Sequence, residues 1–165
     1  TLFRSKSTGI TKGTITDNQL LGQSIKKAVM SANRTSEEDI YSATVSLSGI
    51  HTRTIRSTGL ISIPNQSGLI GETEIKKVLE MAYHNSSMIP EYEAIHIIPI
   101  EFKINDEISD SPINMRGSRL EVTVTIIIAK KSALVNIKNA LQPSGLDIEN
   151  YILSGYASSI STLHH

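Results

Sequence analysis

The middle of the chain contains two strand-like runs separated by a polar segment, and these runs limit the possible folds more than any other pattern in the sequence. In the later run, large apolar side chains occupy every second position: Leu120, Val122, Val124, Ile126 and Ile128. Polar side chains lie between them: Glu121, Thr123 and Thr125. A period of two, built largely from β-branched residues, is typical of a strand with one buried face. The other face is expected to contact water.

The earlier run has the same alternation. Its apolar side chains are predicted to share one face, and they are Ile98, Ile100, Phe102 and Ile104. Pro99, Glu101 and Lys103 fall on the opposite face. Because Pro99 has no N–H for a strand ladder, it predicts an edge strand or a bulge. We interpret both runs as a β-ribbon, with residues 105–118 as a long loop of functional character.

Length and charge restrict the class of protein. A chain of 165 residues suits one domain or two small ones. Lys and Arg number 16, as do Asp and Glu, so the net charge is +0 and a dedicated nucleic-acid-binding protein is disfavoured. The absence of cysteine excludes a disulfide scaffold, a thiolate metal site and a cysteine nucleophile. No apolar run approaches the roughly 20 residues that span a bilayer.

The flanking segments alternate between strand and helix patterns. Residues 1–16 predict a weak strand, and Asp17 caps a helix over residues 18–34 whose apolar stripe includes Leu20 and Leu21. Strands are predicted at 40–48, with Tyr41 on the apolar face, and at 51–63, interrupted by Gly59; Thr73 then caps a helix. A helix at 132–142, a strand at 146–154 and a further helix at 155–163 follow. This order predicts a mixed α/β (α+β) fold.

Two motifs in the central stretch resemble the bacterial cell-division protein FtsA family. The strand carries His96, Pro99, Glu101 and Phe102 at the positions of a family motif. The segment after it matches a second motif at Pro112, Met115, Gly117, Arg119 and Leu120. Ser111 stands where the family usually has an acidic or amide residue.

This resemblance extends over nearly the whole chain and implies its organisation. Residues 1–50 resemble part of an actin-like (ribonuclease H-like) subdomain, called 1A in the family, and residues 131–165 resemble its return segment. Residues 51–130 resemble the inserted subdomain 1C, an SHS2-like strand–helix–strand–strand unit. The first and last pieces are then expected to meet in space. The resemblance also implies a fragment without the glycine-rich nucleotide-binding loops. We therefore expect no enzymatic activity and no cofactor here, with ATP and Mg expected only for the full-length protein.

The resemblance also implies a function. FtsA-type proteins link the FtsZ ring to the membrane at the cytoplasmic face of the division septum and recruit later division proteins. Subdomain 1C serves self-association and FtsN-type partners, whereas FtsZ and the membrane are bound by a second lobe and a C-terminal helix that we expect to be absent here. The alternatives are a PilM-like pilus-assembly ATPase and an ATP-binding enzyme of the actin/Hsp70 fold. The Met-x-Gly-x-Arg-Leu segment, beginning at Met115, favours FtsA.

The candidate partner-binding residues lie in and beside the 105–118 loop. They are Asp106, Glu107, Met115, Arg116, Gly117 and Arg119. Loops on a rigid scaffold often carry function and arginine is enriched at interfaces, so Arg116 and Arg119 are predicted as anchors for a partner. The alternative is a turn with solvated arginines. The acidic residues do not match a calcium-binding loop, and His51, His84 and His96 are too scattered to predict a catalytic or metal site.

Overall fold

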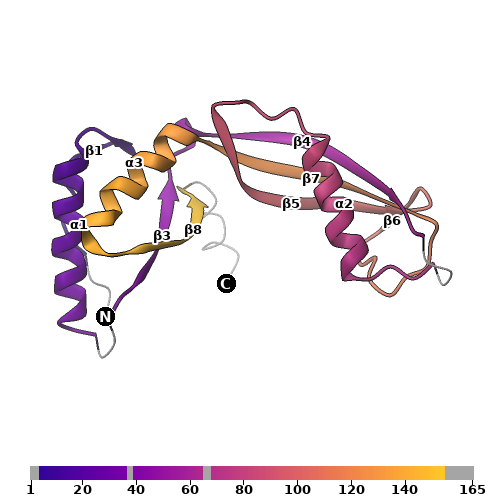
Figure 1. Ribbon diagram of the computed structural model, residues 1–165, viewed down its shortest axis with the longest axis horizontal. Helices are drawn as coiled ribbons and strands as arrows, with labels where there is room; N and C mark the ends of the chain where they lie inside the picture. Colours follow the sequence, from indigo (N-terminus) through magenta and orange to yellow (C-terminus); the bar gives the residue numbers. More distant parts are fainter. Residues whose placement is uncertain (1–3, 37–38, 65–67, 155–165) are drawn as a thin grey trace, which may run out of the picture. The chain divides into compact units, whose positions relative to one another are not determined.

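The computed structural model describes residues 4–36, 39–64 and 68–154. It divides the chain into two compact units (Figure 1). The first combines Thr1–Thr52 with Lys130–His165, and the second is Arg53–Ala129. The sequence analysis divided the chain into three segments, with boundaries after residues 50 and 130. The mixed α/β fold is confirmed, because both units combine helices with strands.

The first unit is built around two parallel strands that are distant in sequence. β3 (Ser42–Leu47) pairs with β8 (Asp147–Leu153), with an irregularity between Ala43 and Thr44. The expectation that the segments 1–50 and 131–165 meet in space is therefore confirmed. Tyr41, predicted on the apolar face of β3, instead precedes the strand and is exposed. Its hydroxyl donates to Asp39 and its carbonyl accepts from Asp147 N–H, so it lies at the entry to the sheet, outside the apolar core.

Two helices complete this unit. α1 (Asn18–Asn33) begins as predicted, with Asp17 Oδ1 accepting from Leu20 N–H at 2.9 Å. α3 (Lys131–Leu141) is followed by a short 3-10 turn, Gln142–Ser144, and by Gly145 with a φ of 72°. Leu21 and Gly22 are buried, but Leu20 is exposed and does not belong to the buried stripe. Successive helical residues are about 100° apart, so Leu20 points away from the core that Leu21 enters.

The N-terminal segment differs from the single weak strand predicted for residues 1–16. β1 (Ile10–Thr11) and β2 (Thr14–Ile15) form a small antiparallel hairpin. Lys12 and Gly13 make its turn with φ values of 48° and 79°. Positive φ at both central residues gives the twist that a two-residue hairpin requires. The helix predicted at 155–163 lies outside the described residues.

The second unit is a four-stranded sheet with a helix on one face (Figure 1). The order of its strands is β4 (Thr52–Ser62), β7 (Arg119–Lys130), β5 (Tyr92–Ile104) and β6 (Glu107–Ser109). Ile63 N–H donates to Ser118 O and Asn105 N–H donates to Arg119 O, so the ends of β4 and β5 both lie beside the start of β7. β7 therefore runs antiparallel to both neighbours, and the predicted β-ribbon of β5 and β7 is confirmed.

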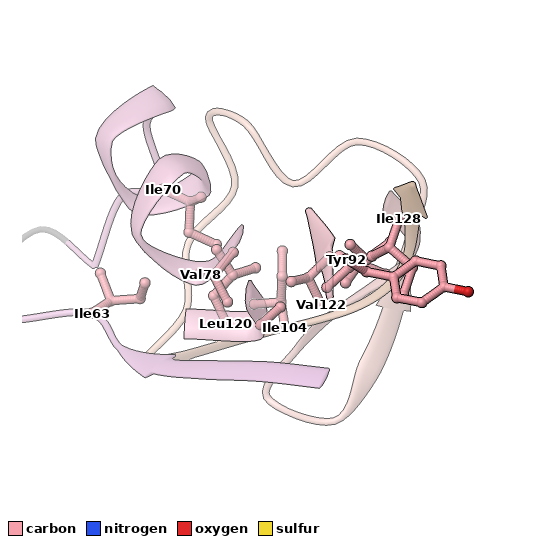
Figure 2. Close-up of a cluster of buried hydrophobic side chains, with 11 residues drawn as sticks. Ile63, Ile70, Val78, Tyr92, Ile104, Leu120, Val122 and Ile128 are labelled. Atoms are coloured by element: carbon pink, nitrogen blue, oxygen red, sulfur yellow. The ribbon is translucent and has the colours of Figure 1, made fainter. Parts of the chain in front are cut away.

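The core of this unit lies between the sheet and α2 (Glu72–His84), as Figure 2 shows. The five apolar residues of β7 that the alternation placed on one face are all fully buried. They pack with buried residues of α2, of β5 and of the segment between β4 and α2, namely Ile63, Ile70, Val78, Ala82, Tyr92 and Ile104. The predicted orientation of β7 is therefore confirmed.

Helix α2 and strand β4 approach each other at Gly59. A Cβ at Gly59 would lie 2.2 Å from Val78 O and 2.5 Å from Ala82 N, so only glycine lets the helix backbone sit this close. The sequence predicted that Gly59 interrupts the strand, which is wrong, because β4 continues through it. Thr73 as the N-cap of α2 is also wrong. The cap is Gly71, and Glu74 Oε2 accepts from Gly71 N–H at 3.0 Å.

Strand β5 departs from the predicted pattern near its middle. Ile100 is 52% exposed, although it was predicted to share a buried face with Ile104. Helix α2 lies against β4, and Ser57 Oγ donates to Ala82 O at 2.7 Å, so the middle of β5 is outside the cluster that the helix covers. The prediction that Pro99 marks an edge is confirmed. β6 pairs only with Phe102–Ile104, so no other strand of the described residues lies beside the rest of this edge.

The 105–118 segment is not one irregular loop. Glu107–Ser109 forms β6, which pairs antiparallel with β5 around a turn at Asn105 and Asp106. Both turn residues have positive φ, 49° and 74°, which asparagine and aspartate tolerate better than other non-glycine residues. Among the helices in the described part of the chain, none combines the length and apolar character needed to cross a membrane.

Candidate functional site

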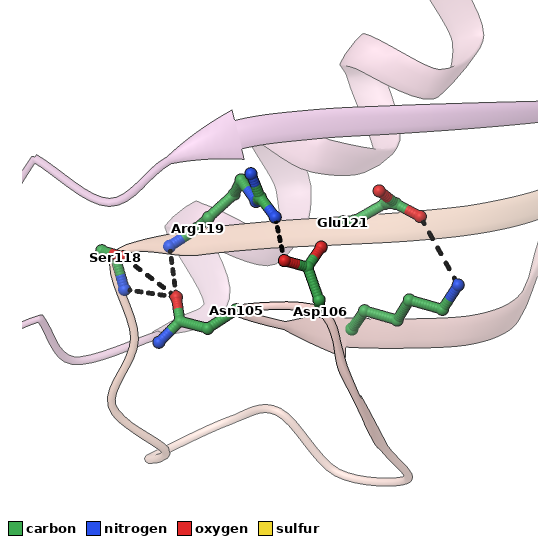
Figure 3. A network of polar contacts seen from close by, with 6 residues as sticks. Asn105, Asp106, Ser118, Arg119 and Glu121 are labelled. Carbon is green, nitrogen blue, oxygen red and sulfur yellow. Dashed lines mark hydrogen bonds and ion pairs between the residues drawn. The ribbon is translucent and has the colours of Figure 1, made fainter.

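The predicted site lies at the end of the second unit where β5, β6 and β7 meet. Asn105 is its central polar group (Figure 3). Its side-chain oxygen accepts from Ser118 N–H at 3.0 Å, from Ser118 Oγ–H at 3.0 Å and from Arg119 N–H at 3.1 Å. One asparagine therefore joins the turn after β5 to the start of β7, and it holds both ends of the segment that contains the candidate residues.

Asp106 and Arg119, both candidate residues, contact each other. The Arg119 guanidinium donates to the Asp106 carboxylate across the same junction (Figure 3). Both side chains are exposed, so water and salt screen the pair and it adds little to stability. Its consequence is geometric, because it directs Arg119 toward the turn. A second ionic group lies nearby on the sheet, where Lys103 Nζ is 3.3 Å from Glu101 and 3.9 Å from Glu121.

Residues 110–118 are held against the segment that precedes α2. Ile70 N–H donates to Met115 O, Asn114 N–H donates to Ile70 O, and Gly117 N–H donates to Gly68 O, each at 2.9 Å. Pro112, within this segment, is buried. These contacts give the loop a defined backbone, although it has no regular secondary structure of its own between β6 and β7.

Gly117 has a steric role in this arrangement. A Cβ at this position would lie 2.3 Å from Cγ2 of Ile104, which is a core residue of β5. The glycine therefore lets the loop backbone close over the end of the core. The sequence predicted Gly117 as part of a turn beside the arginines; the structure shows that it packs tightly against β5.

The remaining candidates present their side chains to solvent. Glu107 begins β6 and is exposed. Arg116 is exposed, pairs through its backbone with Leu69, and makes no ion pair within the described residues. Met115 is 46% exposed, and its sulfur lies 3.1 Å from Ser109 Oγ. Of the two predicted anchors, Arg116 is therefore the one whose charge has no partner there.

Sequence reasoning missed the apolar part of this surface. Ile108 is 67% exposed, and Leu69 and Ile113 are exposed as well. Hydrogen bonds and backbone bridges connect the segments that carry these residues with Met115 and Arg116. We call the set the loop patch: Leu69, Ile108, Ile113, Met115 and Arg116. Large apolar residues in an otherwise polar loop were the available signal, because exposed apolar side chains close together often mark interaction sites.

The first unit contains a cavity of about 350 Å³ that the sequence did not predict. Its walls come from α1, α3, β3 and the β1–β2 hairpin, and most of them are apolar side chains such as Leu21, Val45 and Leu141. His51 Nε2 lies 3.4 Å from Thr14 Oγ1 at one side. Within the described residues, no group of three or more acidic or histidine side chains is placed to hold a metal ion.

Comparison with known proteins identifies the family. Residues 49–128 match the family model described as the SHS2 domain inserted in FtsA. The chain is 33% identical over 162 residues to the cell division protein FtsA of Borreliella burgdorferi, covering 96% of this chain and 38% of that protein. It is 30% identical to the Pseudomonas aeruginosa cell division protein FtsA, covering 95% of this chain and 37% of that protein. The chain thus spans well under half the length of these relatives.

A solved structure shows the same fold. The PilM–PilN type IV pilus biogenesis complex contains a chain that matches 93% of this chain with a TM-score of 0.55 and 15% sequence identity, over 39% of its own length. This likeness supports the predicted actin-like architecture with an inserted subdomain and concerns the fold alone. The sequence matches cover both units of the structure, and the family model covers nearly all of the second. The chain therefore belongs to the FtsA family of cell-division proteins and carries its SHS2 domain at residues 49–128.

Proposed function

We propose that this chain is the partner-binding part of a cell-division protein and acts without catalysis. The observation that supports this proposal is the loop patch, which has exposed apolar side chains on a well-defined backbone. Its Arg116 is charged and makes no ion pair with any residue that the structure describes. Apolar and arginine side chains on a rigid support are the usual composition of an interface.

The biological role that we propose follows the family. In the complete protein, the SHS2 domain would associate with other copies and would recruit later, FtsN-type division proteins. Other parts of the complete protein would bind the FtsZ ring and the cytoplasmic face of the membrane at the septum. ATP and Mg would be bound only by the complete protein.

A PilM-like role in pilus assembly is the second candidate, because a PilM–PilN complex shares the fold. It is weaker because the fold match has 15% identity, whereas the sequence relatives at 30–33% identity are cell division proteins. Binding of purified division proteins compared with purified pilus-assembly proteins separates the two candidates.

The test uses the 165-residue chain and purified cytoplasmic segments of FtsN-type proteins. Arg116→Glu and Ile108→Asp should each weaken binding by about tenfold or more, because hot-spot residues at interfaces commonly contribute this much. Arg56→Glu is the matched control, because Arg56 is also exposed in the second unit but lies on β4. If both loop-patch variants bind like the wild type while remaining folded, the loop patch is not the interface. If FtsZ alone binds, the division of roles proposed here is wrong.

A further inference from the structure

The sheet of the second unit has two outer edges, and they differ in how far they are covered. At the β4 edge, Asn85 Nδ2 donates to Thr58 O at 3.0 Å. The N–H of Ile63 points toward β7, and backbone groups of successive strand residues point to alternate sides. Odd-numbered residues of β4 therefore face β7, and the carbonyl of the even-numbered Thr58 points to the outer edge. The end of α2 therefore occupies a central acceptor of this edge. Arg56 adds an exposed charge, and both features discourage another strand from pairing there.

The β5 edge is open over most of its length. Strand β6 occupies it only opposite Phe102–Ile104, and after Ser109 the chain turns away into the loop. Beyond β6, no strand of the described residues lies beside the outer edge of β5, which begins at Tyr92. A strand that continued the line of β6 would lie beside a part of β5 with which no other described strand pairs, as in recognition of peptides by strand addition.

The side chains on this part of β5 favour an extended partner. Ile97 is 38% exposed and Ile100 is 52% exposed, on either side of Pro99. Pro99 and Ile100 are both exposed although they are adjacent, so the alternation of the strand is broken there. The irregular edge therefore disfavours aggregation by repeated strand pairing. It still offers two large apolar side chains to a single added strand.

The charge of the edge distinguishes among partners. Glu91 and Glu93 are exposed at the start of β5 and have no ion pair within the described residues. The only lysine of β5, Lys103, already faces Glu101 and Glu121. In a second copy pairing antiparallel through β5, the end of the strand with Glu101 and Lys103 would lie beside Glu91 and Glu93. Lys103 already faces Glu101 and Glu121, so β5 of a second copy brings no lysine that is available for these glutamates. A segment with lysine or arginine beside Glu91 and Glu93 would be attracted.

We propose that the open edge of β5 binds an extended, basic segment of another protein as an added strand antiparallel to β5. The segment would place β-branched or apolar side chains against Ile97 and Ile100. Because it would run antiparallel to β5, its C-terminal end would lie beside Glu91 and Glu93 and would carry its lysine or arginine residues. This inference rests on the proposed function in assuming a protein partner, but it assigns a surface separate from the loop patch.

The test uses blocked peptides of about nine residues, the length of an ordinary strand, with alternating valine and threonine. One carries two lysines at the C-terminal end, one carries them at the N-terminal end, and one carries two glutamates at the C-terminal end. Fluorescence anisotropy with the 165-residue chain should show that the first binds about tenfold or more tightly than the third, and more tightly than the second.

Variants of the chain locate the site. Ile97→Lys should weaken binding of the C-terminal lysine peptide about tenfold, because it adds a charge at the exposed edge. Ile97→Thr, which keeps a β-branched residue, should weaken it less. The double variant Glu91→Lys, Glu93→Lys should reverse the preference in favour of the glutamate peptide. Arg56→Glu on β4 and Arg116→Glu in the loop patch should leave the affinity unchanged.

Three results would overturn the proposal. The first is equal binding of the lysine and glutamate peptides, or no binding of either. The second is that Arg56→Glu abolishes peptide binding and Ile97→Lys does not, which would place the site on β4 and not on β5. The third is self-association of the chain alone, seen by sedimentation and abolished by Ile97→Lys, which would make a second copy the occupant. The proposed function fails separately, if Arg116→Glu and Ile108→Asp leave division-protein binding unchanged.

Discussion

At the scale of single residues, two glycines are required by close packing rather than by a turn. Gly59 lies under the backbone of α2, and Gly117 lies against the side chain of Ile104. Neither has a positive φ. In both cases the absence of a Cβ lets two segments pack closely. Glycine is therefore required by the small space available for a side chain, and not by the backbone conformation.

Gly59→Ala should therefore destabilise the protein. The added methyl would overlap Val78 O and Ala82 N, and overpacking of this kind costs about 1–3 kcal/mol. Gly49→Ala is the matched control, because a Cβ there would meet no atom within 4 Å. Urea denaturation of both variants measures the difference. Equal stability of the two variants would mean that α2 can move away from β4 at little cost.

Val124→Asp should have a larger effect. Val124 is fully buried in the centre of β7, and an unpaired carboxylate there would cost about 4 kcal/mol or more, a large share of the stability of a small domain. Thr125→Asp places the same group on the half-buried opposite face, and it should cost about 1 kcal/mol or less. Thermal unfolding compares the two. A smaller loss for Val124→Asp than for Thr125→Asp would contradict the orientation of β7.

At the scale of elements, the β5–β6 hairpin and the following loop behave as one structure. The turn at Asn105 and Asp106 closes the hairpin, and the Asn105 side chain also binds the start of β7. The loop therefore depends on Asn105 for its position at both ends. The exposed ion pair of Asp106 with Arg119 lies beside these bonds and limits where Arg119 can reach.

Asn105→Ala should loosen this structure. It removes an oxygen that accepts three hydrogen bonds, and we expect a loss of about 1–3 kcal/mol. Asn114→Ala is a close control, because Asn114 also has a positive φ, 66°, but its side chain makes no hydrogen bond within the described residues. Hydrogen exchange at Ser118 and Arg119 should accelerate only in Asn105→Ala. Equal effects of the two variants would assign the loss to backbone strain alone.

At the scale of the whole molecule, the second unit has the features of an independently folding insert. It has its own apolar core, and its two ends belong to the neighbouring strands β4 and β7. If residues 53–129 are removed, the two ends left in the first unit lie close together. The removed segment keeps every residue of its own core cluster.

Residues 53–129 produced alone should therefore fold and unfold cooperatively. Circular dichroism should show the mixed helix and strand content of the unit, and thermal unfolding should show a single transition. The rest of the chain, with residues 52 and 130 joined by a short glycine linker, is the companion sample. A disordered 53–129 protein would mean that the insert needs the first unit to fold.

We also expect that the 165-residue chain does not bind ATP appreciably. The sequence contains no glycine-rich strand–turn motif of the kind that cradles nucleotide phosphates. Titration calorimetry with ATP and Mg²⁺ should show no heat beyond dilution, and the chain should hydrolyse no ATP. Micromolar affinity for ATP would contradict this expectation and would direct attention to the cavity of the first unit.

Features that depend on local periodicity and on local capping could be predicted from the amino-acid sequence. The alternation from Leu120 to Ile128 identified the central strand and its buried face, and Asp17 identified the start of α1. Pro99 predicted an edge because its missing donor is a property of one residue. The family resemblance predicted that the first and last segments meet, but not the parallel pairing of β3 with β8, since periodicity does not report which strands pair.

Features that depend on which segment lies opposite a residue could not be predicted in this way, because they are set by the folding of the whole unit. Alternation predicted a buried Ile100, but α2 covers β4 and leaves the middle of β5 exposed. The sequence predicted that Gly59 interrupts its strand. The structure shows that glycine is needed there because the backbone of α2 packs against it. The sequence predicted Arg119 as an anchor for a partner. In the structure, a turn at Asn105 and Asp106 places the Asp106 carboxylate beside it, and the two form an ion pair. Burial of a side chain and pairing of a charge both require a second segment of the chain. A local sequence pattern shows the residue itself but does not show which segment will contact it.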